Sequence, residues 1–180
     1  MERRPRGQSE RWAAGGRRGP GEGARAGSAA RFPAVVPAGR MSRFLNVLRS
    51  WLVMVSVIAA GNTLQSFRDH RFLSEKLYTA SPGLVNGLQA RTFGVWTLLS
   101  SVIRCLCAID IRNRTLYYIT LFTFFLALIH FLSEVFIYHT AALTIGVMAP
   151  LMVASFSILG MLIGLQYLEV EELSQNKKKN

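Results

Sequence analysis

Four long apolar segments follow one another along the chain after residue 41, and short polar segments separate them. Sequence without formal charge covers residues 50–67, 92–103, 115–133 and 135–168. A helix that crosses the hydrocarbon core of a bilayer, about 30 Å thick, needs roughly 20 residues. We therefore predict an all-α, polytopic membrane protein with a bundle of four transmembrane helices, at about residues 44–64, 88–109, 116–138 and 144–167.

The second apolar segment differs from the others because it contains two arginines. Arg91 and Arg104 enclose only twelve uncharged residues, which is about 18 Å of helix. Apolar sequence continues on both sides, so we expect a spanning helix whose arginines reach the interface or pair with a buried acid. Glu134 in the third span lies at a depth similar to that of Arg91, and His130 lies one turn deeper on the same face. We predict an Arg91–Glu134 ion pair; separate contacts with the headgroups are the alternative.

Other polar and small residues mark positions at which spanning helices can contact one another. Asn62 and Gln65, near the end of the first span, are polar groups that would seek partners between helices. Small side chains let helices approach closely, and they occur at Ser56 and Ala60 in the first span and at Gly160 and Gly164 in the fourth. The two glycines form a GxxxG pair, which could also support self-association.

Positive charge is distributed unevenly along the chain, whose formal net charge is +11. Residues 1–40 carry nine Arg and three Glu among many Gly, Ala and Pro, without a hydrophobic period. We expect this segment to be disordered and to have no role in the core function. It has almost no aromatic residues, so we expect no nucleic-acid binding, and it lacks the apolar run of a secretory signal.

The distribution of basic residues around the four spans predicts their orientation. Outside residues 1–40, eight Lys or Arg lie on the side of both termini and four lie on the other side. Cytosolic loops are enriched in Lys and Arg, so both termini should be cytosolic, with residues 169–180 as an unstructured tail. Lys177 and Lys178 then resemble a dilysine retrieval signal of endoplasmic reticulum membrane proteins. A generic basic tail that contacts anionic headgroups is the alternative.

The sequence holds no recognisable catalytic constellation. Its three histidines are too few for a di-iron oxygenase, and it has no P-loop, no HExxH motif and no dinucleotide-binding fingerprint. His130 and Glu134 could hold a metal or transfer a proton, but the span offers no further ligand. Cys105 and Cys107 are interpreted as small apolar residues, with S-acylation as the alternative. We therefore expect no enzymatic activity, no cofactor and no metal site.

Four separated motifs resemble the ergosterol biosynthetic protein 28 family. In chain order they are Asn62-x-x-Gln65, Ala90-Arg91-Thr92-Phe93-Gly94-x-Trp96-Thr97 leading to Arg104, His130-Phe131-x-Ser133-Glu134, and Pro150-Leu151-x-Val153. The resemblance covers essentially all of the chain after Met41, and residues 1–40 have no equivalent in the family.

The resemblance implies a non-catalytic, multi-pass protein of the endoplasmic reticulum membrane that tethers the enzymes of sterol C-4 demethylation. These partners are the sterol C-4 methyl oxidase, the NAD-dependent 3β-hydroxysteroid C-4 decarboxylase and the 3-keto sterol reductase. The residues expected to hold the bundle together or to face partners are Asn62, Gln65, Arg91, Arg104, His130 and Glu134. A protein that itself binds or transfers sterol intermediates is the alternative, which an apolar pocket with a polar group near Arg91 or His130 would favour.

Overall fold

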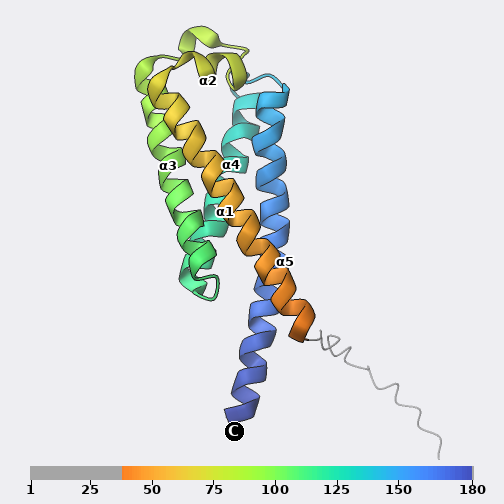
Figure 1. The fold of residues 1–180 in the computed structure, drawn as a ribbon. Coiled ribbons are helices and arrows are strands. Elements are labelled where there is room, and N and C mark those ends of the chain that lie inside the picture. The colour runs from red at the N-terminus through yellow and green to blue at the C-terminus, as the bar shows by residue number, and fades with distance from the viewer. Residues whose placement is uncertain (1–37, 180) are drawn as a thin grey trace, which may run out of the picture. The chain divides into compact units, whose positions relative to one another are not determined.

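The computed structural model describes residues 38–179, and within this range the chain is helical without any strand (Figure 1). Four helices are long and apolar enough to cross a membrane: α1 (Ala38–Arg68), α3 (Gly87–Ile109), α4 (Arg114–Phe136) and α5 (Ile145–Lys179). The short helices α2 (Arg71–Lys76) and η1 (Pro82–Leu84) lie in the connection between α1 and α3. The predicted all-α architecture with four spanning helices is thereby confirmed.

The first and last helices are longer than predicted. α1 begins at Ala38 and not near residue 44, so residues 38–40 of the segment expected to be disordered are helical. The rest of that segment lies outside the described residues. α5 continues to Lys179, so the tail that was expected to be unstructured is also helical. Its Glu, Leu, Gln and Lys residues favour helix, and at 1.5 Å per residue α5 is about 52 Å long, more than a bilayer core requires.

Two ion pairs attach the C-terminal part of α5 to the loop between α3 and α4 and to the first residue of α4. Arg112 Nη2 lies 3.0 Å from Glu171 Oε1. Arg114 donates from Nε to Glu172 Oε1 at 2.7 Å and from Nη2 to Oε2 at 2.6 Å. The start of α1 and the end of α5 lie at the same end of the bundle (Figure 1). The membrane face on which this end lies stays a prediction.

The spanning helices pack chiefly as two pairs, α1 with α3 and α4 with α5 (Figure 1). Small residues separated by three or four positions line the contact between α1 and α3. They are Ser56, Ala59, Thr63 and Ser66 on α1, and Ala90, Gly94, Thr97 and Ser101 on α3. Hydroxyl groups join the two helices within this contact, as at Thr63 and Thr97, whose oxygens lie 2.9 Å apart. Close approach and hydrogen bonding are the forces that associate helices in lipid.

Gly164, one of the two glycines predicted to make helix contacts, lies where α5 meets α1 and α4. A Cβ atom at Gly164 would lie 2.5 Å from the Tyr117 hydroxyl and 2.9 Å from Leu48 Cδ2. One at Gly160 would lie 3.6 Å from Leu48 Cδ1. The Tyr117 hydroxyl donates to the carbonyl of Met161 at 2.6 Å. The glycine pair therefore serves contacts within the chain, and self-association stays a prediction.

The buried apolar side chains form two clusters, one towards each end of the bundle. The cluster nearer the termini includes Leu52, Tyr117, Phe124 and Met161. The other cluster, beneath α2, includes Leu73, Phe93, Phe131 and Val147. Large apolar side chains also cover the outside of every spanning helix, for example Val57, Leu99, Phe122 and Leu159, each more than half exposed. Such a surface is suited to lipid or to other membrane helices.

Candidate functional site

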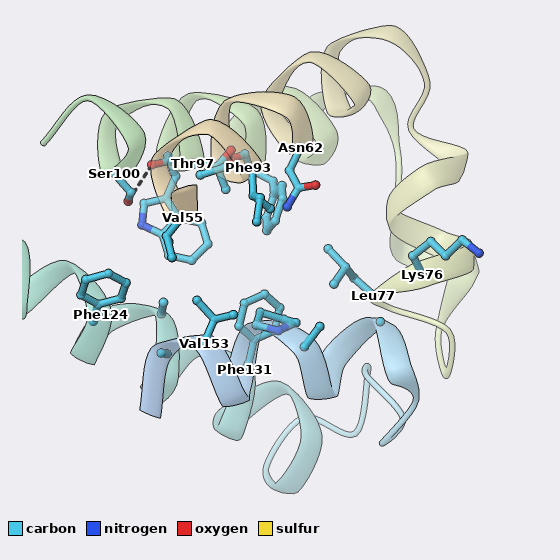
Figure 2. Close-up of a pocket in the computed structure, with 18 of the residues that line it drawn as sticks. Val55, Asn62, Lys76, Leu77, Phe93, Thr97, Ser100, Phe124, Phe131 and Val153 are labelled. Atoms are coloured by element: carbon cyan, nitrogen blue, oxygen red, sulfur yellow. Dashed lines mark hydrogen bonds between the residues drawn. The ribbon is translucent and has the colours of Figure 1, made fainter. Parts of the chain in front are cut away.

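An apolar cavity of about 420 Å³ lies between the two core clusters (Figure 2). All four spanning helices and α2 contribute to its wall, which is mostly aliphatic and aromatic. Its polar side chains are few: Asn62, Lys76, Thr97, Ser100 and Arg104. On α3 the lining extends from Phe93 to Arg104, about 16 Å along the helix axis. The volume falls within the range of roughly 300–1,000 Å³ that is typical of small-molecule sites.

The cavity is elongated between two differently built ends. In Figure 2, Ser100, Val55 and Phe124 lie towards one end, and Leu77 and Lys76 of the α2 region lie towards the other. The wall is not closed everywhere, because Ile58 of α1 lines the cavity and is nevertheless 53% exposed. At Ile58 the wall of the cavity is thus also part of the outer surface of the bundle.

Arg104 places a guanidinium group in the wall of this cavity although the residue is only 8% exposed. Its Cζ lies 4.1 Å from the centre of the Phe124 ring, and its Nε donates to Thr123 Oγ1 at 3.3 Å. Within residues 38–179, no acidic side chain forms an ion pair with it. A cation–π contact and one neutral acceptor stabilise a buried cation only in part. Arg104 is thus a charged group whose environment lacks a counter-ion from the described chain.

A second polar group forms where the α2–η1 connection packs against α4. The Tyr78 hydroxyl and His130 Nε2 are 2.8 Å apart, and His130 Nδ1 lies 3.9 Å from Glu134 Oε1. The Thr140 hydroxyl donates to Glu134 Oε2. Burial, and secondly the negative charge of Glu134, raise the pKa of Tyr78. Tyr78 therefore keeps its proton and can donate a hydrogen bond to His130 Nε2, which leaves Nδ1 facing Glu134.

The predicted Arg91–Glu134 ion pair is wrong, because Glu134 contacts other residues and no ion pair joins it to Arg91 within the described part of the chain. Arg91 is exposed, and its Nη1 lies 3.1 Å from the position of a Cβ built on Gly87, one turn earlier in α3. Glu134 is instead occupied by His130 on its own helix and by Thr140 in the following turn. The Glu134 carboxylate is thus paired with residues close to it in the sequence and not with Arg91 of α3.

The other residues predicted from the sequence are divided between the cavity, the Tyr78 group and the outer surface. Asn62 and Arg104 line the cavity, whereas Gln65 is exposed on α1. Lys177 and Lys178 are exposed in the last turn of α5. Sequence reasoning missed Tyr78, since it lies in a segment interpreted as a polar connection. It also missed Phe124, which only the fold places beneath Arg104.

The comparison with known proteins concerns the same part of the chain. A family model described as Erg28 like protein matches residues 48–159, which include every residue that lines the cavity. The chain belongs to the Erg28 family. This confirms the resemblance that the four sequence motifs indicated. The Tyr78–His130–Glu134 group also lies within the range matched by the Erg28 model.

Relatives in this family come from animals, fungi and a plant. The chain is 81% identical over 140 residues to the ergosterol biosynthetic protein 28 homolog of Homo sapiens, which covers 78% of this chain and 100% of the relative. It is 42% identical over 113 residues to ergosterol biosynthetic protein 28 of Schizosaccharomyces pombe, covering 63% and 82%. The Saccharomyces cerevisiae protein of that name is 34% identical over 114 residues, covering 63% and 77%. No solved structure matches the chain.

Proposed function

We propose that this member of the Erg28 family is a non-catalytic scaffold of the endoplasmic reticulum membrane in sterol biosynthesis. Its partners are the sterol C-4 methyl oxidase, the 3β-hydroxysteroid C-4 decarboxylase and the 3-keto sterol reductase. The names of the relatives, which refer to ergosterol biosynthesis, support the pathway. Holding successive enzymes together raises the local concentration of an intermediate that is dissolved in the membrane.

The observation that carries the scaffold proposal is the apolar outer surface of the bundle. Val57 is 66% exposed, Leu99 59%, Phe122 60% and Leu159 58%, so all four spanning helices offer large side chains to neighbouring membrane helices. The far end of α5 adds a helical surface beyond the bundle, with Leu173 70% exposed. Two ion pairs hold this part of α5 near the α3–α4 loop. They fix the orientation of the helical surface that a partner protein would contact.

The scaffold proposal is tested by affinity purification of the tagged full chain from gently solubilised microsomes. We expect the three enzymes to copurify, and sterols that retain C-4 methyl groups to accumulate when the protein is depleted. Re-expression of the wild-type chain should reverse the accumulation. A stable protein that reaches the endoplasmic reticulum and recovers none of the three enzymes would overturn the proposal.

A second function, binding or transfer of a sterol intermediate, is favoured by the cavity. Its volume and apolar lining suit a rigid lipid, and Arg104 is the buried cation among its polar side chains. His130, near which a polar group was expected, lines a separate pocket together with Tyr78. This function and the scaffold are compatible, but they predict different results. Accumulation of sterol intermediates on depletion, without copurification of the enzymes, would favour the binding protein.

A further inference from the structure

We propose that the cavity binds a lipid that carries a single carboxylate, and that Arg104 pairs with this carboxylate. The proposal rests on the second candidate function, lipid binding, and not on the scaffold. Its basis is one juxtaposition: a buried guanidinium without an acidic partner in residues 38–179 lines a cavity whose wall is mostly apolar. The other cation of the wall, Lys76, is exposed.

The charge of Arg104 selects the chemistry of the occupant. Arg104 lies five residues before the end of α3 at Ile109, about 8 Å along the helix from that end. A cation at such a position is expensive unless an anion or water accompanies it. The ring of Phe124 lies on one side of the guanidinium, and Thr123 Oγ1 accepts a hydrogen bond from Arg104 Nε. These two contacts fix the orientation of the guanidinium. A planar guanidinium binds a carboxylate through two parallel hydrogen bonds, a geometry that a hydroxyl or a ketone cannot match.

The shape of the cavity selects the rest of the molecule. From Arg104 the lining runs towards Phe93 and Phe131, over a length of about 16 Å along α3. Val55, Val153 and Ala154 add aliphatic wall on the way. An acid at one end of a compact apolar body would therefore place its charge on Arg104 and its body between α1, α3, α4 and α5. A steroid acid and a long-chain fatty acid share this chemistry.

Ligand competition on the purified full chain tests the preference for a carboxylate. The protein is placed in nanodiscs of phosphatidylcholine and labelled with a photoreactive steroid carboxylic acid, against which unlabelled competitors are titrated. We expect the steroid acid to compete at least about tenfold more strongly than its methyl ester, because the ester loses a charge-assisted hydrogen bond. Stronger competition by oleic acid than by the unlabelled steroid acid would assign the site to fatty acids, and failure of oleic acid to compete would assign it to steroid acids. Equal competition by the acid and the ester would overturn the proposal.

Variants then test whether Arg104 is the residue that pairs with the carboxylate. Arg104→Gln keeps a polar side chain but removes the charge. It should lower the affinity for the steroid acid about tenfold and leave the affinity for the methyl ester unchanged. The matched control is Arg68→Gln, which changes an exposed arginine at the end of α1 that does not line the cavity. Wild-type affinity of Arg104→Gln for the acid would overturn the assignment.

A cavity-filling variant keeps the test decisive if Arg104→Gln does not fold. Ala127 lines the cavity from α4, and Ala127→Phe should abolish labelling by the acid while Arg104 stays in place. Undiminished labelling of a folded Ala127→Phe protein would show that the ligand lies elsewhere and would overturn the proposal. These assays use purified protein without enzymes, so their failure is distinct from a failure of the scaffold to copurify with its partners.

Discussion

Ser56 of α1 and Ser101 of α3 hydrogen-bond to each other's backbone across the contact between the two helices. Ser56 Oγ donates to the Ser101 carbonyl at 2.6 Å, and Ser101 Oγ donates to the Ser56 carbonyl at 2.8 Å. Both residues are buried, at 5% and 6% exposure. A side chain as short as serine can reach a carbonyl on another helix only when the backbones are very close. The pair thus shows that the backbones of α1 and α3 approach closely here, as in other membrane helix contacts built on small residues.

Removal of either serine hydroxyl should weaken the contact between α1 and α3. We expect Ser56→Ala and Ser101→Ala each to lower the free energy of unfolding by about 0.5–1.5 kcal/mol, the range found for hydrogen bonds between membrane helices. The double variant should lose less than the sum, because the two hydroxyl oxygens also contact each other at 3.2 Å and the loss of either removes that contact. Denaturation of the protein in mild detergent measures these losses. Ser50→Ala is the matched control, since the Ser50 hydroxyl bonds only to the carbonyl of Asn46 on its own helix; a purely additive double variant would contradict the reciprocal pair.

Gly146, at the start of α5, should not tolerate a side chain. A Cβ atom there would collide with the backbone carbonyl of Lys76 at the end of α2. Backbone cannot move aside as a flexible side chain can, so we expect Gly146→Ala to lower the free energy of unfolding by about 1–3 kcal/mol. Gly61→Ala is the control, because a Cβ at Gly61 meets nothing within 4 Å. Thermal unfolding in detergent compares them, and equal melting temperatures would show that α2 does not pack closely on α5.

Replacement of Arg104 by an apolar residue of similar length should leave the ligand-free protein at least as stable. Arg104→Met removes a buried charge that has no acidic partner among the described residues, at the loss of the Phe124 and Thr123 contacts. We expect a free energy of unfolding equal to that of the wild type or up to about 2 kcal/mol higher. Thermal unfolding without added lipid tests this expectation. A large destabilisation would show that Arg104 supports the bundle and is not held there for a ligand.

Tyr78 should make stability depend on pH in the alkaline range. Its pKa is raised above the ordinary value of 10.0 by burial and by Glu134. The unfolded chain therefore loses this proton first, and the contribution of Tyr78 to stability is complete below pH 10 and declines as the pH rises above it. Tyr78→Phe should remove that part of the decline and, at neutral pH, should lower the free energy of unfolding by about 0.5–1.5 kcal/mol through loss of the His130 bond. Identical pH profiles of the two proteins would contradict this assignment.

The predicted span at residues 88–109 and the observed helix α3, Gly87–Ile109, agree closely because hydropathy and length alone define a spanning helix. The face that each helix turns inward was less predictable. Arg91 and Arg104 are thirteen residues apart, which places them about 140° apart around a helix of 3.6 residues per turn. That angle was available from the sequence, and it indicates that the two arginines cannot share one environment. The sequence did not indicate which of the two arginines is buried; the structure shows that it is Arg104.

The sequence by itself determined four spanning helices, the family motifs and the absence of a familiar catalytic pattern. The sequence also placed His130 and Glu134 on one helix face. Tertiary structure alone decided that Arg104 and Phe124 meet at a cavity, that Glu134 takes Thr140 as a further partner, and that Ser56 bonds to Ser101. The physical reason is that lipid and protein interior are equally apolar. Hydrophobic periodicity therefore does not mark the buried face of a membrane helix, and close packing and hydrogen bonds set its rotation instead.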